Sequence, residues 1–256
     1  MPDEYEFINI GLQSGVAVLS LNRPPLNVLH IPMLEEMDSA LDALAEDQEV
    51  RVLILAAEGK MFSAGVDIAD HTPEKVGGMI PLFDHVCLKL AQFPVPTVAA
   101  VHGHALGGGC ELVLCCDLAG IAGEAKIGQP EIQLAAFAPV AALRLRQLIG
   151  YRAAADMLFS GENLSADQAM EIGLVNAVLP AEQVGAWARE KAARMAGFSR
   201  AAQILNKKAL GLGFQSWQAD VSVVEDSYLN ELMITADALE GLAAFQEKRP
   251  PQWKHK

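Results

Sequence analysis

The 256-residue sequence predicts an α/β fold, and three apolar segments of strand length are the main reason. They cover residues 50–57, 96–101 and 118–122, and the first of them is closed by Glu58-Gly59. Segments with helical spacing of apolar residues lie between and after these strands. Alternating strands and helices are typical of α/β proteins. The length fits one large domain, or one domain with a smaller appendage.

The elements before residue 50 are a hairpin and a helix. Residues 5–21 alternate apolar and polar side chains around Ser14-Gly15, which predicts a β-hairpin. Apolar residues recur with helical spacing between residues 32 and 48, which predicts an amphipathic helix. After about residue 140 helical patterns dominate, and the predicted helices cover 141–149, 153–160, 165–172, 181–196 and a last block at 200–247.

Composition excludes several classes of protein. With 52% apolar and 20% charged residues, the chain should form a substantial core. A net charge of −13 argues against nucleic-acid binding, which depends on Lys and Arg contacts to phosphate. No apolar run approaches the ~20 residues that span a bilayer, so no membrane partner is expected. The N-terminus lacks a signal-peptide pattern and the four cysteines have no Cys-x-x-Cys spacing, so we expect reduced thiols in a cytoplasmic protein.

The most informative segment is the glycine-rich stretch at 102–111, which directly follows the strand at 96–101. Three consecutive glycines let the backbone bend sharply and approach a ligand without a Cβ in the way. The apolar run at 112–116 indicates a buried helix, whose first free N–H groups attract negative charge. The segment therefore predicts an oxyanion-binding loop with a carboxylate, Glu111, beside it. A plain strand-to-helix turn is the alternative, and the spacing fits neither a Walker loop nor a dinucleotide fingerprint.

A second loop of similar character, residues 61–67, follows the strand at 50–57. Two such loops can direct two backbone N–H groups at one carbonyl oxygen, and each donor contributes ~10²–10³ in the rate of acyl chemistry. Asp67 is predicted to cap its own helical turn. Ser63 lacks a Gly-x-Ser-x-Gly elbow and an obvious His partner, which argues against a serine hydrolase.

Glu111 and Glu131 are the candidate acid–base pair. Burial of a carboxylate without partners is costly, so a glutamate at an apolar helix start is unusual. Two carboxyls in different environments are what water addition to a double bond requires, because one deprotonates water while the other protonates carbon. A solvated or salt-bridged role is the alternative for each. His102 and His104 have a spacing that could bind a metal, but no third ligand follows suitably, and no metal site is predicted.

Three segments together carry a family resemblance. Residues 62–68, 103–111 and 127–131, in this order and spacing, resemble the crotonase (enoyl-CoA hydratase/isomerase) superfamily. The resemblance covers nearly the whole chain, from residues 22–24 to 244–249. It implies a spiral of ββα repeats with the active site over residues 1–195, and a C-terminal helical trimerisation region over residues 196–256. A homotrimer or homohexamer is the assembly that it implies.

The resemblance also implies the substrate and the role of each site residue. The substrate is an acyl-CoA thioester, so coenzyme A is part of the substrate and no separate cofactor is expected. The backbone N–H groups of Val66 and Gly108 bind the thioester oxygen, Glu131 protonates carbon, and Glu111 positions and activates water. The remaining substrate-binding positions are Ala64, Gly107, Phe137 and Lys248, the last of which contacts the CoA phosphates of a neighbouring subunit.

The segment after Glu131 departs from the usual family pattern. Straight-chain hydratases are glycine-rich around a proline there, whereas residues 134–142 of this chain are apolar. Together with residues 66–75, this segment resembles the cyclohexa-1,5-diene-1-carbonyl-CoA hydratases of anaerobic aromatic degradation. Such an enzyme forms 6-hydroxycyclohex-1-ene-1-carbonyl-CoA. A straight-chain enoyl-CoA hydratase, an enoyl-CoA isomerase that needs one glutamate, and a non-catalytic acyl-CoA-binding or RNA-binding protein are the alternatives.

Overall fold

Two sheets form the centre of the computed structural model, which describes residues 5–211 and 217–254. The larger sheet has the strand order β1-β2-β3-β4-β6-β9. Its first pair is antiparallel and every later pair is parallel. The strands are β1 (Ile8–Gln13), β2 (Val16–Leu21), β3 (Val52–Ala57), β4 (Thr97–Val101), β6 (Leu118–Ala122) and β9 (Ala177–Leu179).

The smaller sheet joins β5 (Ala105–Leu106), β7 (Lys126–Gly128) and β8 (Leu164–Ser165) in that order. Its first strand directly follows β4 of the larger sheet and leads into helix α3 (Gly108–Leu114). The chain therefore passes from one sheet to the other within a few residues. The carboxyl ends of β3 and β4 lie at this crossing, which is where ligands bind in open α/β sheets.

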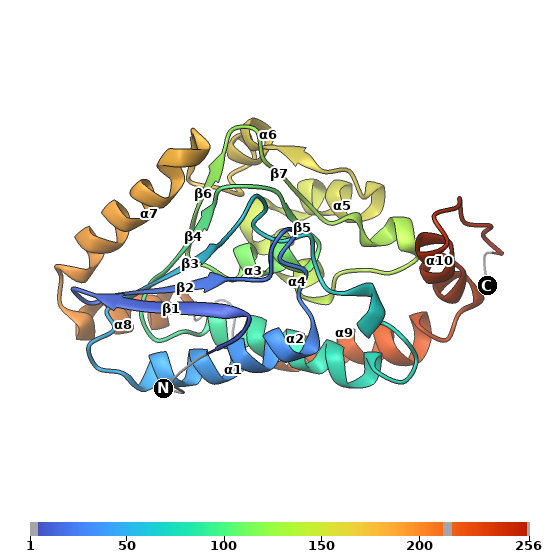
Figure 1. Ribbon diagram of the computed structural model, residues 1–256, viewed down its shortest axis with the longest axis horizontal. Coiled ribbons are helices and arrows are strands. Elements are labelled where there is room, and N and C mark those ends of the chain that lie inside the picture. Colours follow the sequence, from blue (N-terminus) through green and yellow to red (C-terminus); the bar gives the residue numbers. More distant parts are fainter. Residues whose placement is uncertain (1–4, 212–216, 255–256) are drawn as a thin grey trace.

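Helices cover both faces of the larger sheet. Helices α1 (Ile31–Glu46) and α2 (Val76–Ala91) lie on one face and α7 (Ala181–Ala196) lies on the other (Figure 1). Helix α7 buries Val184, Ala188, Ala192 and Ala196, a four-residue spacing that places all of them on the side toward β3, β4 and β6. The main core thus lies between these helices and the parallel strands.

The middle of the chain forms a second helical group. It consists of η2 (Pro130–Leu134), α4 (Pro139–Ile149), α5 (Tyr151–Ser160) and α6 (Ala166–Glu171). Ser165 caps α6 with a capping box, in which its side chain accepts from Gln168 N and the Gln168 side chain accepts from Ser165 N.

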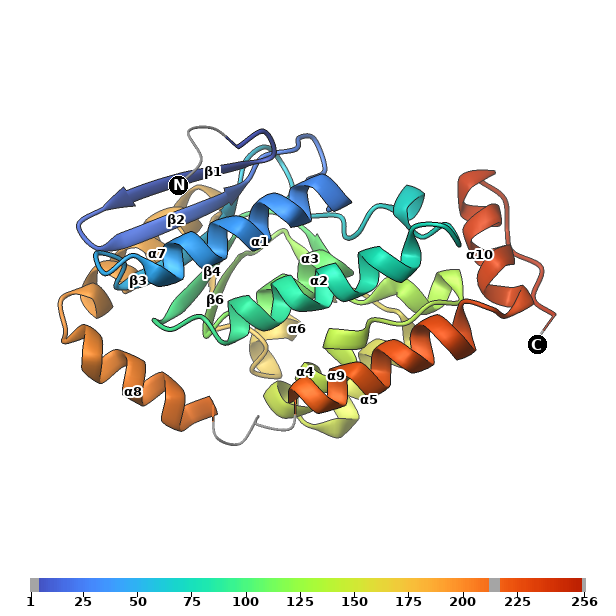
Figure 2. The ribbon, with the colours of Figure 1, turned by 90° about the horizontal axis from the view of Figure 1, so that it is seen from below.

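The described C-terminal part consists mainly of helices. It contains α8 (Arg200–Leu210), α9 (Trp217–Asp226), the π-helical turn η4 (Ser227–Leu232) and α10 (Ala236–Gln246). Lys207 of α8 forms an ion pair of 2.7 Å with Asp117, the residue before β6. Figure 2 shows α9 beside α2, whereas α10 lies at the end of the molecule away from β1 and β2.

The α/β prediction is confirmed, and so are the hairpin around Ser14-Gly15 and the helices near 32–48 and 181–196. The last predicted block, 200–247, is divided into several helices. Helix α2 was not predicted. The division into two regions at residue 195 stays a prediction. The expectation of no signal peptide was based on residues 1–4, which lie outside the described part of the chain. Within the described ranges, no helix combines the length and apolarity needed to cross a membrane.

Helix α10 meets η2 at a backbone contact that only glycine permits. A Cβ on Gly241 would overlap the carbonyl group of Leu134, whereas a Cβ on Gly77 in α2 would meet no atom within 4 Å. Overpacking against rigid backbone costs about 1–3 kcal/mol. Alanine in place of an unobstructed helical glycine gains about 0.5–1 kcal/mol.

We therefore expect Gly241→Ala to lower Tm by several degrees, and Gly77→Ala to leave it unchanged or to raise it slightly. Differential scanning calorimetry of the two variants measures both. Equal changes in Tm for the two variants would show that α10 does not pack closely against the backbone of η2.

Candidate active site

Three loop segments meet in one short backbone ladder. Ser63, after β3, forms a parallel bridge with Ala105 of β5, and Ala105 pairs with Ile127 of β7. Leu106 N donates to Ser63 O at 3.0 Å, and Gly107 N donates to Gly128 O at 2.9 Å. The ladder therefore brings together the three segments that the sequence analysis selected, although 64 residues separate Ser63 from Ile127.

Buried polar side chains hold the first loop in shape. The Ser63 hydroxyl donates to Asn27 O at 2.7 Å and accepts from Gly65 N at 3.1 Å. The Asn27 amide in turn donates to the backbone oxygens of Glu58 and Met61. Ser63 is fully buried, so its hydroxyl serves the loop backbone and is not presented to a ligand.

The loops that carry the two predicted backbone donors touch each other. Gly65 has φ +104°, and a Cβ built on it would lie 3.5 Å from Gly108 N. Val66 follows this turn. Gly108 is the first residue of α3, so no carbonyl within that helix can accept a hydrogen bond from its N–H group. The two predicted donors, Val66 N and Gly108 N, thus belong to loops in direct contact. Both residues line the same cavity, as Ala64 and Gly107 do.

Glu111 lies in the first turn of α3, with a side chain that is 3% exposed. Its Oε1 accepts a 2.9 Å hydrogen bond from Ala141 N at the start of α4. Burial raises the pKa of Glu111 to about 7, although the backbone N–H groups of Ala141 and Val140 favour the charged form. This carboxyl therefore changes its charge near neutral pH.

Glu131 stands opposite, in the 3₁₀-helical turn η2. Burial, and then repulsion from Glu111, raises its pKa to about 8. The NH₂ end of the buried Gln129 amide, turned toward it, donates to Oε1 at 3.2 Å and Oε2 at 3.0 Å. A Cβ on Gly107, where φ is +54°, would lie 2.5 Å from Oε1, so only glycine leaves room for this carboxyl. Sequence reasoning did not select Gln129 as a partner of Glu131.

The two carboxyls open on an apolar cavity of about 240 Å³. Phe137 forms one wall, and its ring meets the Tyr228 ring edge to face at a centroid distance of 5.1 Å. Tyr228 was not selected from the sequence. The other apolar lining residues include Val66, Ile68, Ile80, Phe83, Leu134, Ala136, Ala138, Pro139, Leu242 and Phe245.

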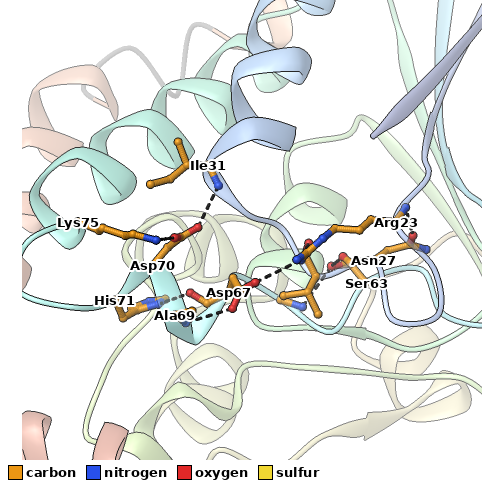
Figure 3. Close-up of polar contacts among 11 residues, drawn as sticks. Arg23, Asn27, Ile31, Ser63, Asp67, Ala69, Asp70, His71 and Lys75 are labelled. Carbon is orange, nitrogen blue, oxygen red and sulfur yellow. Dashed lines mark hydrogen bonds and ion pairs between the residues drawn. The ribbon is translucent and has the colours of Figure 1, made fainter. Parts of the chain in front are cut away.

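One polar cluster holds the loop beside the cavity, and Figure 3 shows it. Asp67 caps the 3₁₀ turn η1 (Ile68–Asp70) by accepting from Ala69 N at 3.1 Å, which confirms its predicted role, and its other oxygen pairs with Arg23 at 3.2 Å. His71 lines the cavity, with Nδ1 3.0 Å from Asp67 O. A carbonyl only accepts, so Nδ1 carries the proton and Nε2 is left as an acceptor. Burial lowers the pKa of His71 and keeps the ring neutral.

The structure does not bring Lys248 to the cavity of its own chain. This residue follows α10, is exposed, and has φ +54°. Its predicted contact with a neighbouring subunit stays a prediction. His102 and His104 bond separately to the backbone, at Gly59 O and Lys126 N. All four cysteines are buried free thiols.

A third carboxyl lies behind the pair. Asp84 of α2 is 1% exposed, and within the described ranges no N–H group donates to either of its oxygens, whereas the Glu225 carboxyl lies within hydrogen-bond reach. Burial, and then the carboxyls of Glu111 and Glu225, raises its pKa to about 9. Asp84 therefore keeps its proton at neutral pH.

Comparisons with known proteins agree on one family. The family model described as enoyl-CoA hydratase/isomerase matches residues 11–256. A probable enoyl-CoA hydratase of Mycobacterium tuberculosis is 35% identical over 255 residues, or 98% of this chain and 99% of the relative. The cyclohexa-1,5-dienecarbonyl-CoA hydratase of Thauera aromatica is 33% identical over 240 residues, or 93% and 92%. The crystal structure of an enoyl-CoA hydratase/isomerase from Pseudoalteromonas atlantica T6c has a TM-score of 0.89 at 27% identity, covering 97% of this chain and 100% of that one.

The raised pKa of Asp84 predicts a pH-dependent effect on stability. The folded chain keeps a proton that the unfolded chain releases, so wild-type stability falls as pH rises from about 4 toward about 9. An amide has no such proton to lose. We expect the Tm of Asp84→Asn minus that of the wild type to increase by at least about 4 °C between pH 5 and pH 9.

The exposed Asp156 provides the matched control, because Asp156→Asn should shift Tm equally at all pH values. Thermal melts of the three proteins across this range measure the difference. A Tm difference for Asp84→Asn that does not vary with pH would mean that Asp84 is ionised in the folded protein.

Proposed function

The chain belongs to the enoyl-CoA hydratase/isomerase family, and from this premise we propose that it adds water to a conjugated enoyl- or dienoyl-CoA thioester. It is an enzyme of the hydro-lyase class that acts on acyl-CoA. The observation that carries the proposal is the placement of Glu111 and Glu131 on one apolar cavity, beside two loops that offer backbone N–H groups. Cyclohexa-1,5-diene-1-carbonyl-CoA is the substrate that we propose.

The two loops supply the electrostatic part of the mechanism. The thioester oxygen accepts hydrogen bonds from Val66 N and Gly108 N. Water attack pushes electrons from the double bond onto this oxygen, so the donors stabilise the transition state more than the ground state. Each such donor contributes ~10²–10³ in rate.

The two carboxyls divide the proton transfers between them. Glu111 accepts backbone hydrogen bonds that favour its ionised form, so it takes the proton from the attacking water. Glu131 has the higher pKa of the two and supplies a proton to carbon. Near neutral pH the pair holds about one proton, which is the state that hydration consumes and regenerates.

Bond changes in the cyclic substrate determine where the two carboxyls act. Hydroxide adds to ring carbon C2, which is β to the thioester, and electrons spread over C1, C6 and C5 as a dienolate. Protonation at C5 forms the C1=C6 double bond, and renumbering the ring gives 6-hydroxycyclohex-1-ene-1-carbonyl-CoA. Attack at C2 is the route that charges the thioester oxygen, so it is the route that the N–H groups stabilise.

Two observations support the ring substrate. Residues 134 and 136–139, within the apolar segment that departs from the family pattern, line the cavity. A relative named as a cyclohexa-1,5-dienecarbonyl-CoA hydratase also matches most of the chain. The second candidate function is hydration of a straight-chain enoyl-CoA, which is favoured by the relatives of similar identity that are named enoyl-CoA hydratase. We place the enzyme in anaerobic aromatic degradation, in the cytoplasm.

The proposed enzyme is a homotrimer or homohexamer in which Lys248 contacts the CoA phosphates bound by a neighbouring subunit. Exposed apolar side chains of the C-terminal helices support an assembly, among them Leu205 and Leu210, which are 65% and 78% exposed.

Parallel assays test the substrate. Purified protein is given cyclohexa-1,5-diene-1-carbonyl-CoA or crotonyl-CoA, and the gain of one water is followed by mass spectrometry. A higher kcat/KM on the cyclic diene supports the proposal. A higher kcat/KM on crotonyl-CoA would identify a straight-chain hydratase. The absence of turnover with both thioesters would contradict hydration of either one.

Removal of one carboxyl separates a hydratase from an isomerase. We expect Glu131→Gln to lower kcat by ~10²–10⁴ and to leave thioester binding nearly unchanged, because the amide retains the shape of the side chain. Glu111→Gln should lower kcat similarly. The exposed Glu124 gives the control, and Glu124→Gln should leave kcat and KM at wild-type values. Isothermal titration with a product thioester measures binding, and substantial remaining turnover in either cavity variant would favour an isomerase that uses one glutamate.

A further inference from the structure

Tyr228 has an environment that none of the roles above explains. Its side chain is 1% exposed, yet it lines the cavity with both catalytic carboxyls. It lies in the π-helical turn η4, in which Met233 N donates to Tyr228 O at 3.0 Å. π-Helical turns are rare and frequently occur at functional sites. Tyr228 thus brings an aromatic side chain from the C-terminal helices into the cavity.

The Tyr228 ring and the Phe137 ring form a corner. Their planes meet at 70° with a centroid distance of 5.1 Å. Aromatic pairs in this edge-to-face arrangement are attractive beyond the area that they bury. The two rings come from segments about 90 residues apart, so the corner forms only when η4 packs against the chain after η2. A flat six-membered ring can stack on one face of this corner while its edge meets the other.

Tyr228 has three buried carboxyl groups in its surroundings. Burial, followed by the carboxyls of Glu131, Glu111 and Asp84, raises the pKa of the phenol. The phenol therefore keeps its proton near neutral pH and can donate a hydrogen bond. Apart from the two carboxyls, Tyr228 is the one described side chain lining the cavity that carries an O–H group. Of the three carboxyls, Glu131 has the largest effect on the pKa of Tyr228.

We propose that Tyr228 is a specificity-determining residue that selects a cyclic dienoyl group over a straight-chain enoyl group. This inference rests on the proposed function. In straight-chain hydration the proton from Glu131 goes to the carbon next to the thioester. In the cyclic diene it goes to C5, two bonds farther round the ring. The Tyr228 hydroxyl donates to the Glu131 carboxylate as its proton leaves for C5, and the aromatic corner holds the ring in place.

The step needs no further reactant. The O–C2 bond forms as water gives one proton to Glu111, the C5–H bond forms as Glu131 gives up its proton, and the C1=C6 double bond replaces the original pair. Tyr228 keeps its own proton throughout. Its two contributions can be separated, because Tyr228→Phe removes the hydroxyl alone and Tyr228→Leu removes the aromatic face as well.

The test is the ratio of kcat/KM for cyclohexa-1,5-diene-1-carbonyl-CoA to that for crotonyl-CoA. We expect Tyr228→Phe to lower this ratio about tenfold or more, mainly through kcat on the cyclic diene, because a hydrogen bond to a charged group is lost. Tyr228→Leu should lower the ratio further and raise KM for the cyclic diene. Tyr151, which is 72% exposed on α5, gives the control, and Tyr151→Phe should leave the ratio unchanged.

Two results would overturn the inference, and they are distinguishable from failure of the proposed function. If Tyr228→Phe lowers kcat/KM for both thioesters by the same factor, Tyr228 has a structural role only. If the variant keeps the wild-type kcat/KM on both thioesters, its hydroxyl has no role in selecting the substrate. If the wild-type enzyme hydrates crotonyl-CoA but not the cyclic diene, the proposed substrate is wrong, and selection by Tyr228 is wrong with it.

Discussion

The site depends on the backbone ladder that joins Ser63, Ala105 and Ile127. This ladder lies where the chain passes from the larger sheet to the smaller one. It sets the positions of the two proposed N–H donors, because Val66 and Gly108 each lie three residues beyond a ladder residue. It also sets Glu131, which follows Ile127 by four residues. Backbone hydrogen bonds between the three segments therefore establish the relative placement of the proposed catalytic groups.

Electrostatics of the cavity follow from this placement. The ladder and its loops hold two carboxyls in largely apolar surroundings, where full ionisation of both is unfavourable. Backbone N–H groups favour the charged form of Glu111, whereas Glu131 experiences the charge of Glu111. The result is a pair that shares about one proton near neutral pH. An acid and a base are thus present together in a protein whose net charge is −13.

Local sequence patterns predict the parts of this arrangement that are encoded locally. Glycines before an apolar helix indicate the loop at 102–111, and Glu111 is recognisable because an apolar helix start surrounds it. Helix α2 was missed because Gly77, Gly78 and Pro81 lie inside it, and these residues ordinarily oppose helix formation. Packing against α1 and α9 overrides that preference. Contacts between distant segments have no local signal, so the roles of the buried Asp84 and of the Tyr228 ring emerge only from the structure.

The pH dependence of kcat/KM tests the central claim most directly, which is that Glu111 and Glu131 act as a pair holding one proton. Below the lower pKa both carboxyls are protonated and no base is present, and above the higher pKa no acid is present. Measured on the thioester that the enzyme hydrates, the profile should be bell-shaped, with limbs near the pKa values of about 7 and about 8. A flat profile from pH 5 to pH 10, or a single limb near the ordinary glutamate pKa, would contradict the account.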